Sequence, residues 1–334
     1  MVTISVLAGG PPAEHDVSMQ TAAEMLGELR GGGHNARPVR IGRDGSWQLG
    51  DTDAQFDELS EAGGASRETA IGALKDSGDI ALLGLHGLFG EDGELQRLLE
   101  QAGIPFTGSS SQASRVGMDK ELSKVAAARL GGRCASHEVV RGDSVPVNRL
   151  LKLVGLPCIV KPLRGGSSVG ATRVRDEDEL EPAVNRARDE DPEGHAMVES
   201  WLDGVEVSCG VLRVRGQLRT LPIVGIRPSG DRFYDYHAKY EAEDTQLECP
   251  ARIPRETARE IGQLTAALYA SLELRGVARM DFIVNGETGQ ASFLELNTLP
   301  GFTAHSLVPL AARVDGLSRL DVLEAVLADA EAAP

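Results

Sequence analysis

Long apolar runs and aromatic side chains are scarce in this sequence of 334 residues. No apolar run reaches the roughly 18 residues that a membrane-spanning helix needs. Residues 1–10 carry no basic segment of the kind that opens a signal peptide. We therefore expect a cytoplasmic protein with no membrane partner. Because aromatic residues make up only 4% of the chain, Leu, Val, Ile and Ala must fill its core.

The sequence also has few cysteines, and its basic residues are fewer than its acidic ones. The four cysteines, at positions 134, 158, 209 and 249, form no CxxC pair, which argues against a zinc site and a disulfide framework. The formal net charge of −16 disfavours a partner held by its phosphate backbone, so we expect no nucleic-acid partner. A nucleotide remains compatible with this charge, because a few local lysines can hold a triphosphate.

Two common nucleotide-binding motifs are missing. The sequence contains neither the Gly-Lys-Ser/Thr end of a Walker A motif nor a GxGxxG fingerprint. The glycine pair Gly9-Gly10 does follow the first predicted strand, which suggests a dinucleotide-dependent oxidoreductase as an alternative. The lack of a complete fingerprint with a downstream ribose-binding acid argues against that class.

Strands and helices alternate in the first hundred residues. We predict strands at residues 3–7 and 80–85 and helices at residues 18–30 and 94–101. This rhythm predicts an α/β fold with a Rossmann-like parallel sheet, whose ligand-binding loops lie at the carboxyl ends of the strands. The acidic, Gly- and Ala-rich residues 51–64 are expected to form a surface insertion.

The pattern of predicted strands and helices changes after residue 108, and we place domain boundaries near residues 108 and 198. The three predicted domains are residues 1–108, 109–198 and 199–334. Beyond the first boundary, the predicted helices are 119–130, 255–273 and 319–328, and the predicted strands are 158–161, 198–201, 205–214, 277–284 and 292–296.

A loop rich in glycine and serine follows the predicted strand that ends at Lys161. Residues 161–170 have the sequence KPLRGGSSVG. Backbone N–H groups and hydroxyls of such a loop can surround an anion, while the lysine supplies a positive charge. A merely flexible connection is the alternative, and this segment alone does not decide between them.

Polar side chains alternate with apolar ones on the two predicted strands near the carboxyl terminus. Arg279 and Asp281 share a face of one strand, as Glu295 and Asn297 do on the next. If the strands pair, two carboxylates and an amide oxygen meet beside an arginine, which suits Mg²⁺ that also holds phosphates. A polar face turned to water is the alternative. The apolar positions between them predict a buried opposite face: Ala278, Met280, Phe282, Leu294 and Leu296.

The ordered set of motifs resembles the ATP-grasp superfamily and, within it, the D-alanine–D-alanine ligases. The resemblance implies an ATP-grasp fold preceded by a Rossmann-like domain, and an enzyme that joins two D-alanines through an acyl phosphate for peptidoglycan precursor synthesis. It also suggests a homodimer through the amino-terminal domain. The motifs are residues 8–18 (AGGPPAEHDVS), 86–93 (HGLFGEDG), 105–109 (PFTGS), 118–120 (MDK), 233–240 (FYDYHAKY) and 295–309 (ELNTLPGFTAHSLVP).

The resemblance implies that ATP and two Mg²⁺ ions, for which Mn²⁺ can substitute, bind the central and C-terminal domains. A lid at residues 227–246 closes over them. The implied residues are Lys120, Lys161 and Lys239 for the phosphates, Glu199 and Leu202 for adenine, Glu206 for ribose, and Asp281, Glu295 and Asn297 for the metal.

A second group of residues is implied to bind the two D-alanine substrates. Glu14 binds the ammonium of the first, although its position at a helix start also fits a capping role. The remaining residues are Ser167 and Tyr240, which bond with Glu14 and hold the lid shut; His86, beside the first substrate; Arg279 and the Gly301 N–H, which form an oxyanion site; and Ser306 with the Leu307 N–H, which hold the second carboxylate.

Two positions depart from the family pattern. Ser200 stands where a lysine near the adenine is common, and Gly165 replaces an acidic residue of the glycine-serine loop. We expect these changes to affect ATP affinity and loop rigidity. The alternatives within reach are a ligase that joins D-alanine to D-serine or D-lactate, an antibiotic-pathway copy, and a non-catalytic ATP-binding module. The intact set of metal-binding and arginine side chains argues against the last.

Overall fold

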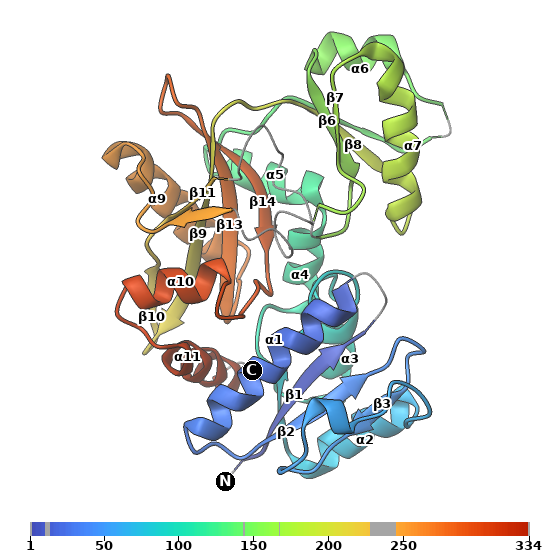
Figure 1. Ribbon diagram of the computed structural model, residues 1–334, viewed down its shortest axis with the longest axis vertical. Helices are drawn as coiled ribbons and strands as arrows, with labels where there is room; N and C mark the ends of the chain where they lie inside the picture. The colour runs from blue at the N-terminus through green and yellow to red at the C-terminus, as the bar shows by residue number, and fades with distance from the viewer. Residues whose placement is uncertain (1, 11–13, 143, 167, 228–244, 333–334) are drawn as a thin grey trace.

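The structure is a computed structural model that describes residues 2–10, 14–142, 144–166, 168–227 and 245–332. Three sheets with their helices follow one another along the chain, from the blue N-terminal lobe through the green central lobe to the orange and red C-terminal lobe (Figure 1). Within the described ranges, no helix is both long enough and apolar enough to cross a membrane.

The N-terminal sheet has the strand order β3-β2-β1-β4. β1 pairs in parallel with β2 and β4, whereas β3 is antiparallel to β2. Because carboxyl ends of parallel strands meet at one edge, the segments after β1 and β4 lie close together there. The elements are β1 (Ile4–Gly9), α1 (His15–Gly31), β2 (Ala36–Ile41), β3 (Trp47–Leu49), the 3-10 turn η2 (Phe56–Glu58), α2 (Arg67–Ser77), β4 (Ile80–Leu83) and α3 (Glu94–Ala102).

The central sheet is antiparallel, with the order β5-β8-β6-β7. Val160 of β6 and Val198 of β8 are buried in an apolar core with side chains of α6 and α7. Because side chains alternate along a strand, Lys161 and Glu199 lie on the opposite face. The elements are β5 (His137–Val140), α6 (Val147–Val154), β6 (Cys158–Pro162), β7 (Thr172–Val174), η3 (Glu177–Glu179), α7 (Leu180–Glu190) and β8 (Ala196–Ser200).

The C-terminal sheet has the order β12-β11-β9-β13-β14, and β10 also pairs with β9. One face packs on α9 in a core that includes Val207, Met280 and Phe293. The strands are β9 (Val205–Val214), β10 (Gln217–Thr220), β11 (Val224–Arg227), β12 (Gln246–Glu248), β13 (Val277–Val284) and β14 (Ala291–Asn297), and the helices are α4 (Ser111–Met118), α5 (Lys120–Arg129), α9 (Arg255–Ser271), α10 (Leu307–Val314) and α11 (Arg319–Glu331).

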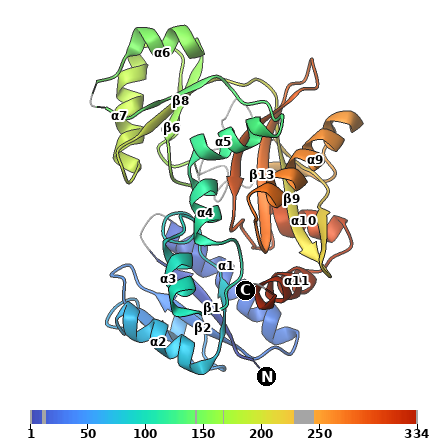
Figure 2. The same ribbon diagram turned by 180° about the vertical axis from the view of Figure 1, so that it is seen from behind.

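The last helix returns to the first lobe. α11 lies beside α1 in both views (Figures 1 and 2) and contacts β4. One buried apolar core contains Leu26 of α1, Leu82 of β4, Val326 of α11, and Phe302 of the segment before α10. The segment before α10 therefore lies at the junction of the N-terminal and C-terminal lobes.

The mixed α/β architecture confirms the predicted fold class. The predicted strands 205–214 and 277–284 match β9 and β13 at both ends. The boundaries near residues 108 and 198 stay predictions, and β8 contains the second of them. Residues 51–64 are more than a surface insertion, because Phe56 is buried in the core that joins the lobes.

The expectation that Leu294 shares the buried face of β14 with Leu296 is wrong. The register of β13 against β14 shifts between Asp281 and Phe282, so that Phe282 lies opposite Phe293. Such a β-bulge changes which residues point to each face. Phe293 is consequently buried, and Leu294 instead lines a cleft.

Candidate active site

A cleft lies between the central and C-terminal sheets. Apolar side chains such as Ile159 and Ile283 form part of its wall. A mixed lining of this kind can accept a flat apolar ring together with charged groups. Six residues implicated by the resemblance line this one cleft, although they come from distant parts of the chain: Lys120, Lys161, Glu199, Leu202, Glu206 and Glu295.

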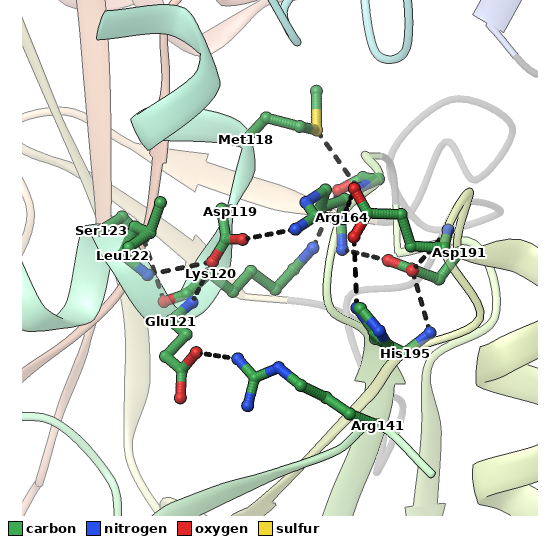
Figure 3. A network of polar contacts seen from close by, with 12 residues as sticks. Met118, Asp119, Lys120, Glu121, Leu122, Ser123, Arg141, Arg164, Asp191 and His195 are labelled. Atoms are coloured by element: carbon green, nitrogen blue, oxygen red, sulfur yellow. Dashed lines mark hydrogen bonds and ion pairs between the residues drawn. The ribbon is translucent and has the colours of Figure 1, made fainter. Parts of the chain in front are cut away.

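The start of the glycine-serine loop is fastened to the beginning of α5. Arg164 forms an ion pair with Asp119 at 3.2 Å, and its backbone N–H donates to Asp191 at 2.8 Å (Figure 3). Lys120 Nζ donates to the Gly165 carbonyl at 2.8 Å. These contacts hold the loop beside the Lys120 ammonium at the cleft wall.

Three charged side chains form a row of ion pairs beside the cleft. The Glu199 carboxylate contacts Lys161 Nζ through one oxygen and lies 2.9 Å from Lys124 Nζ through the other. The side chains of Lys124 and Glu199 are 0% and 2% exposed. Burial by itself raises the pKa of Glu199, but the two lysines outweigh burial and hold this pKa at about 2. Glu199 is therefore ionised at neutral pH.

The ammonium of Lys161 is also stabilised by its surroundings. Burial lowers the pKa of Lys161, but the carboxylates of Glu199, Glu295 and Glu206 outweigh burial and raise this pKa above its usual value. Lys161 therefore offers the cleft a permanent positive charge, which suits a phosphate.

Four polar side chains of β13 and β14 share one face of the C-terminal sheet. Arg279 lies opposite Asn297, and Asp281 lies opposite Glu295. Because opposite residues of antiparallel strands point to the same side, the expected shared face is confirmed. The Asp281 carboxylate accepts from Arg279 Nη2 at 2.8 Å, from Asn297 Nδ2 at 3.0 Å, and from the hydroxyl of Ser208 on β9.

The oxygen donors of this face suit a hard cation. Among the residues that the structure describes, no three His, Cys, Asp or Glu side chains gather into a metal site. Asp281, Glu295 and Asn297 supply two carboxylates and one amide, a set that Mg²⁺ accepts when phosphates complete its coordination. The donor set thus fits Mg²⁺, provided that Asp281 gives up part of its contact with Arg279.

Glu14 lies between two glycines of different loops. The residue is 6% exposed. A Cβ added at Gly87 would overlap the Glu14 carboxylate, and one at Gly166 would lie 2.6 Å from Glu14 Oε1. Although Glu14 occupies the N-cap position of α1, its side chain accepts no capping hydrogen bond, so the capping alternative is not observed. Glycine at both positions permits the close approach of the carboxylate.

His86 and Glu91 hold the backbone of Leu299 from both sides. His86 Nδ1 lies 3.0 Å from the Leu299 carbonyl, and Nε2 lies 2.9 Å from the Thr21 hydroxyl. Burial lowers the pKa of His86 to about 4, so the ring is neutral. Because a carbonyl only accepts, Nδ1 carries the proton. The Leu299 N–H donates to Glu91 at 2.9 Å, as does the Gly87 N–H.

The segment predicted to bind the second substrate precedes and begins α10. Ser306 is the N-cap residue of this helix, and Leu307 is its first residue. The Ser306 hydroxyl accepts the Thr303 N–H at 3.0 Å. A Cβ at Gly301 would lie 2.9 Å from Ser306 Oγ, so glycine lets the loop approach this hydroxyl closely. Gly301 and Ser306 are thereby brought together, as their predicted roles require.

Ser167, Lys239 and Tyr240 lie outside the described residues, together with most of the predicted lid. Their roles stay predictions.

The two departures from the family pattern have distinct surroundings. Ser200 lines the cleft, and its hydroxyl donates to the Val154 carbonyl at 2.8 Å. Gly165 has a φ of 133°, which strongly favours glycine. The loop conformation of this chain therefore matches its glycine rather than the more common acidic residue.

The sequence interpretation missed Lys124, Ser208 and Glu91 as individual site residues. Lys124 follows Lys120 by four residues on one helix, a spacing that places both on one face. Ser208 follows Glu206 by two residues on a strand, so these two also share a face. Glu91 lies within a quoted motif, but nothing in the sequence connects it to Leu299.

Comparisons with known proteins identify the family of the chain. Two protein-family models match the chain. The family model of the D-ala D-ala ligase N-terminus matches residues 3–109, and that of the D-ala D-ala ligase C-terminus matches residues 135–328. The chain belongs to the D-alanine–D-alanine ligase family. Its members are ATP-grasp enzymes, so the predicted fold, family and ligase class are confirmed.

Individual members of the family resemble the chain over nearly its whole length. The D-alanine–D-alanine ligase of Mycobacterium tuberculosis is 35% identical over 92% of this chain and 90% of that protein. Two structures of the Bacillus anthracis D-alanine–D-alanine ligase, the second complexed with ATP, share 30% and 27% identity, have TM-scores of 0.80 and 0.77, and each cover 99% of this chain and 98% of theirs. The VanG D-Ala:D-Ser ligase of Enterococcus faecalis shares 26% identity, with a TM-score of 0.79, over 98% of this chain and 99% of that one.

Proposed function

We propose that the protein joins two D-alanines to D-alanyl-D-alanine and converts ATP to ADP and phosphate. One observation carries this proposal: Lys120, Lys161 and Glu295 line the same cleft, and Glu295 shares its sheet face with Arg279 and Asp281. Cationic groups for phosphates, oxygen donors for a metal and an arginine for a developing oxyanion are thus adjacent.

ATP would occupy the cleft. Lys120 and Lys161 would bind its phosphates, joined by Lys239 from the lid. Leu202 and Glu199 would border the adenine, and Glu206 would accept hydrogen bonds from the ribose hydroxyls. The Glu199 carboxylate, which contacts Lys161, would also orient that ammonium toward the phosphates. The ATP complex of the related Bacillus anthracis ligase supports this ligand.

Asp281, Glu295 and Asn297 would hold two Mg²⁺ ions, or Mn²⁺ in their place. When bound, these ions neutralise the charge of the phosphates.

The two substrates would react in sequence within this site. A carboxylate oxygen of the first D-alanine attacks the γ-phosphorus of ATP, and the bond to ADP breaks to give an acyl phosphate. The amine of the second D-alanine then attacks the acyl carbon, a proton leaves the nitrogen, and phosphate departs. Glu14 would bind the first ammonium beside the neutral His86. Ser167 and Tyr240 would close the lid over it, because an acyl phosphate must be kept from water.

Attack of the second amine on the acyl phosphate would place negative charge on the oxygen of a tetrahedral intermediate. Arg279 and the Gly301 N–H would stabilise the tetrahedral oxyanion. Ser306 and the Leu307 N–H, at the start of α10, would hold the carboxylate of the second D-alanine.

A ligase that joins D-alanine to D-serine is the second candidate, favoured by the similarity to VanG. The higher identity to a protein named D-alanine–D-alanine ligase supports D-alanine. ADP release with D-Ala, D-Ser, D-lactate and L-Ala, with identification of each product, tests the choice. Turnover of L-Ala equal to that of D-Ala, or product formation without ATP, would contradict the proposal.

The cellular setting follows from the same proposal. D-alanyl-D-alanine would enter peptidoglycan precursors in the cytoplasm, and the enzyme would act as a homodimer through its N-terminal domain. Light scattering of the purified protein tests the dimer, and complementation of a strain that requires D-alanyl-D-alanine tests the pathway.

A further inference from the structure

The backbone between Gly301 and Ser306, here called the 301–306 loop, is held by side chains from both ends of the chain. Glu24 lies on α1 and Arg319 is the first residue of α11. The Ala304 N–H donates to Glu24 Oε2 at 2.9 Å, and Arg319 Nη2 donates to the Phe302 carbonyl at 3.1 Å. The two side chains thus hold the backbone on either side of Thr303.

The two side chains also bind each other. Arg319 Nη2 lies 2.9 Å from Glu24 Oε2, the same oxygen that accepts the Ala304 N–H. Their side chains are only 21% and 28% exposed. Charge-assisted bonds of this kind are stronger than neutral ones. Removing either residue therefore weakens the other's contact with the loop.

Packing limits the loop further. Phe302 is 1% exposed, and the Arg319 guanidinium lies 5.5 Å from the centre of its ring. The backbone bonds of Glu24 and Arg319 lie between Gly301 on one side and Ser306 on the other. In the proposed function, the Gly301 N–H stabilises the oxyanion of the second step, and Ser306 holds the carboxylate of the second D-alanine.

We infer that Glu24 and Arg319 are positioning residues that set the geometry of the site for the second D-amino acid. This inference rests on the proposed function and deepens it. Neither side chain needs to touch substrate. Instead, the ion pair between the N-terminal and C-terminal lobes fixes the distance between the Gly301 N–H and Ser306. Loss of the pair should therefore weaken binding of the second D-amino acid more than binding of the first D-amino acid or of ATP.

The test compares Glu24→Ala with Glu28→Ala. Glu28 lies one turn further along α1 and also reaches Arg319, at 3.4 Å, but its side chain makes no described bond to the 301–306 loop, so it is a matched control. For Glu24→Ala we expect the KM of the second D-alanine to rise about tenfold, while the KM values of the first D-alanine and ATP stay within twofold. Glu28→Ala keeps all three near parental values.

Glu24→Gln adds a rescue variant. Its amide oxygen can still accept the Ala304 N–H but carries no charge. We expect the KM of the second D-alanine in Glu24→Gln to lie much closer to the parental value than it does in Glu24→Ala. Equal KM values in Glu24→Ala and Glu28→Ala would overturn the inference. A similar rise in all three KM values of Glu24→Ala would also overturn it, because that pattern indicates a merely structural role.

Hydrogen exchange separates this inference from the proposed function. In Glu24→Ala the Ala304 amide should exchange at least tenfold faster than in the parent and in Glu28→Ala. A parent enzyme that forms no dipeptide would overturn both proposals together. An active parent with unaltered exchange and unaltered KM values in Glu24→Ala would overturn only the positioning role.

Discussion

Asp281 and Glu295 are direct cross-strand partners on β13 and β14, with both carboxylates on the face that Arg279 and Asn297 share. Two carboxylates held side by side repel each other unless a cation lies nearby. Arg279 supplies that charge to Asp281 at 2.8 Å. The Mg²⁺ of the proposed function would supply such a charge to both carboxylates.

Glu295→Gln should lower kcat more than a hundredfold, which corresponds to about 2.7 kcal/mol of barrier. The amide keeps the shape of the side chain but removes one anionic ligand of a phosphate-bridging metal. ADP release at saturating ATP, D-alanine and Mg²⁺ measures the effect.

The matched control for this change is Glu287→Gln, in the exposed turn between the same two strands. It should have parental kcat and the same thermal unfolding temperature as Glu295→Gln. A Glu295→Gln enzyme within tenfold of the parent would show that this carboxylate is not a metal ligand.

Ser200→Lys should lower the KM for ATP about threefold and leave kcat nearly unchanged. Ser200 lines the cleft, and an ammonium there can donate to the adenine, which adds uniform binding rather than transition-state stabilisation. Initial rates over a range of ATP concentrations provide the measurement. Ser200→Ala is the control, because it loses the bond to the Val154 carbonyl without adding a charge. An unchanged or raised KM in Ser200→Lys would contradict the prediction.

Much of the fold was predictable where a strand combines alternation with a buried face. β9 and β13 place Val207, Cys209, Met280 and Phe282 on their core side, and polar residues stand between these positions. The sequence interpretation did not assign α7. Its buried residues Leu180, Ala183, Val184 and Ala187 recur at the spacing of one helix face, so the helix itself was predictable, whereas the sheet that it covers was not.

The site was predictable only as far as its residues follow local periodicity. The shared face of Asp281 and Glu295 follows from strand alternation, but the bulge that turns Leu294 into the cleft depends on how the two strands pair. The partners of Glu199 could not be predicted either, because Lys124 lies 75 positions away on α5 and meets it only when three elements pack together.

Lys124→Met should destabilise the protein by about 3 kcal/mol. Removing one member of a buried ion pair leaves an incompletely compensated charge, which is much costlier than losing a surface pair. Glu199 keeps Lys161 as a partner, so we expect the lower end of the range for buried pairs. Urea unfolding at pH 7 measures the change.

Lys152→Met is the matched control, because Lys152 is exposed on α6 and its loss should change the free energy of unfolding by less than about 0.5 kcal/mol. The double variant Lys124→Met/Glu199→Gln should recover part of the loss, since it also removes the buried anion. A Lys124→Met protein as stable as Lys152→Met would mean that the ion pair contributes nothing to the fold.

Glu91→Gln should change how stability depends on pH. Burial raises the pKa of Glu91 to about 7 in the folded protein, from an ordinary value of 4.5. The folded state therefore retains a proton that the unfolded state releases, and the free energy of unfolding falls as pH rises from about 4.5 to about 7. The contribution is fully present below pH 4.5 and lost above pH 7.

A neutral glutamine lacks this titration, so the stability of Glu91→Gln relative to the parent should rise between pH 5 and pH 8, by about 1–3 kcal/mol. At pH 5 the folded parent carries a protonated Glu91, whereas at pH 8 it carries a carboxylate that accepts the Gly87 and Leu299 N–H groups more strongly than an amide does, an effect that the pKa of about 7 already includes. Glu287→Gln, whose carboxylate is exposed, should show no such trend. Urea unfolding of the three proteins at both pH values decides the matter: a constant difference between Glu91→Gln and the parent would mean that Glu91 is ionised throughout.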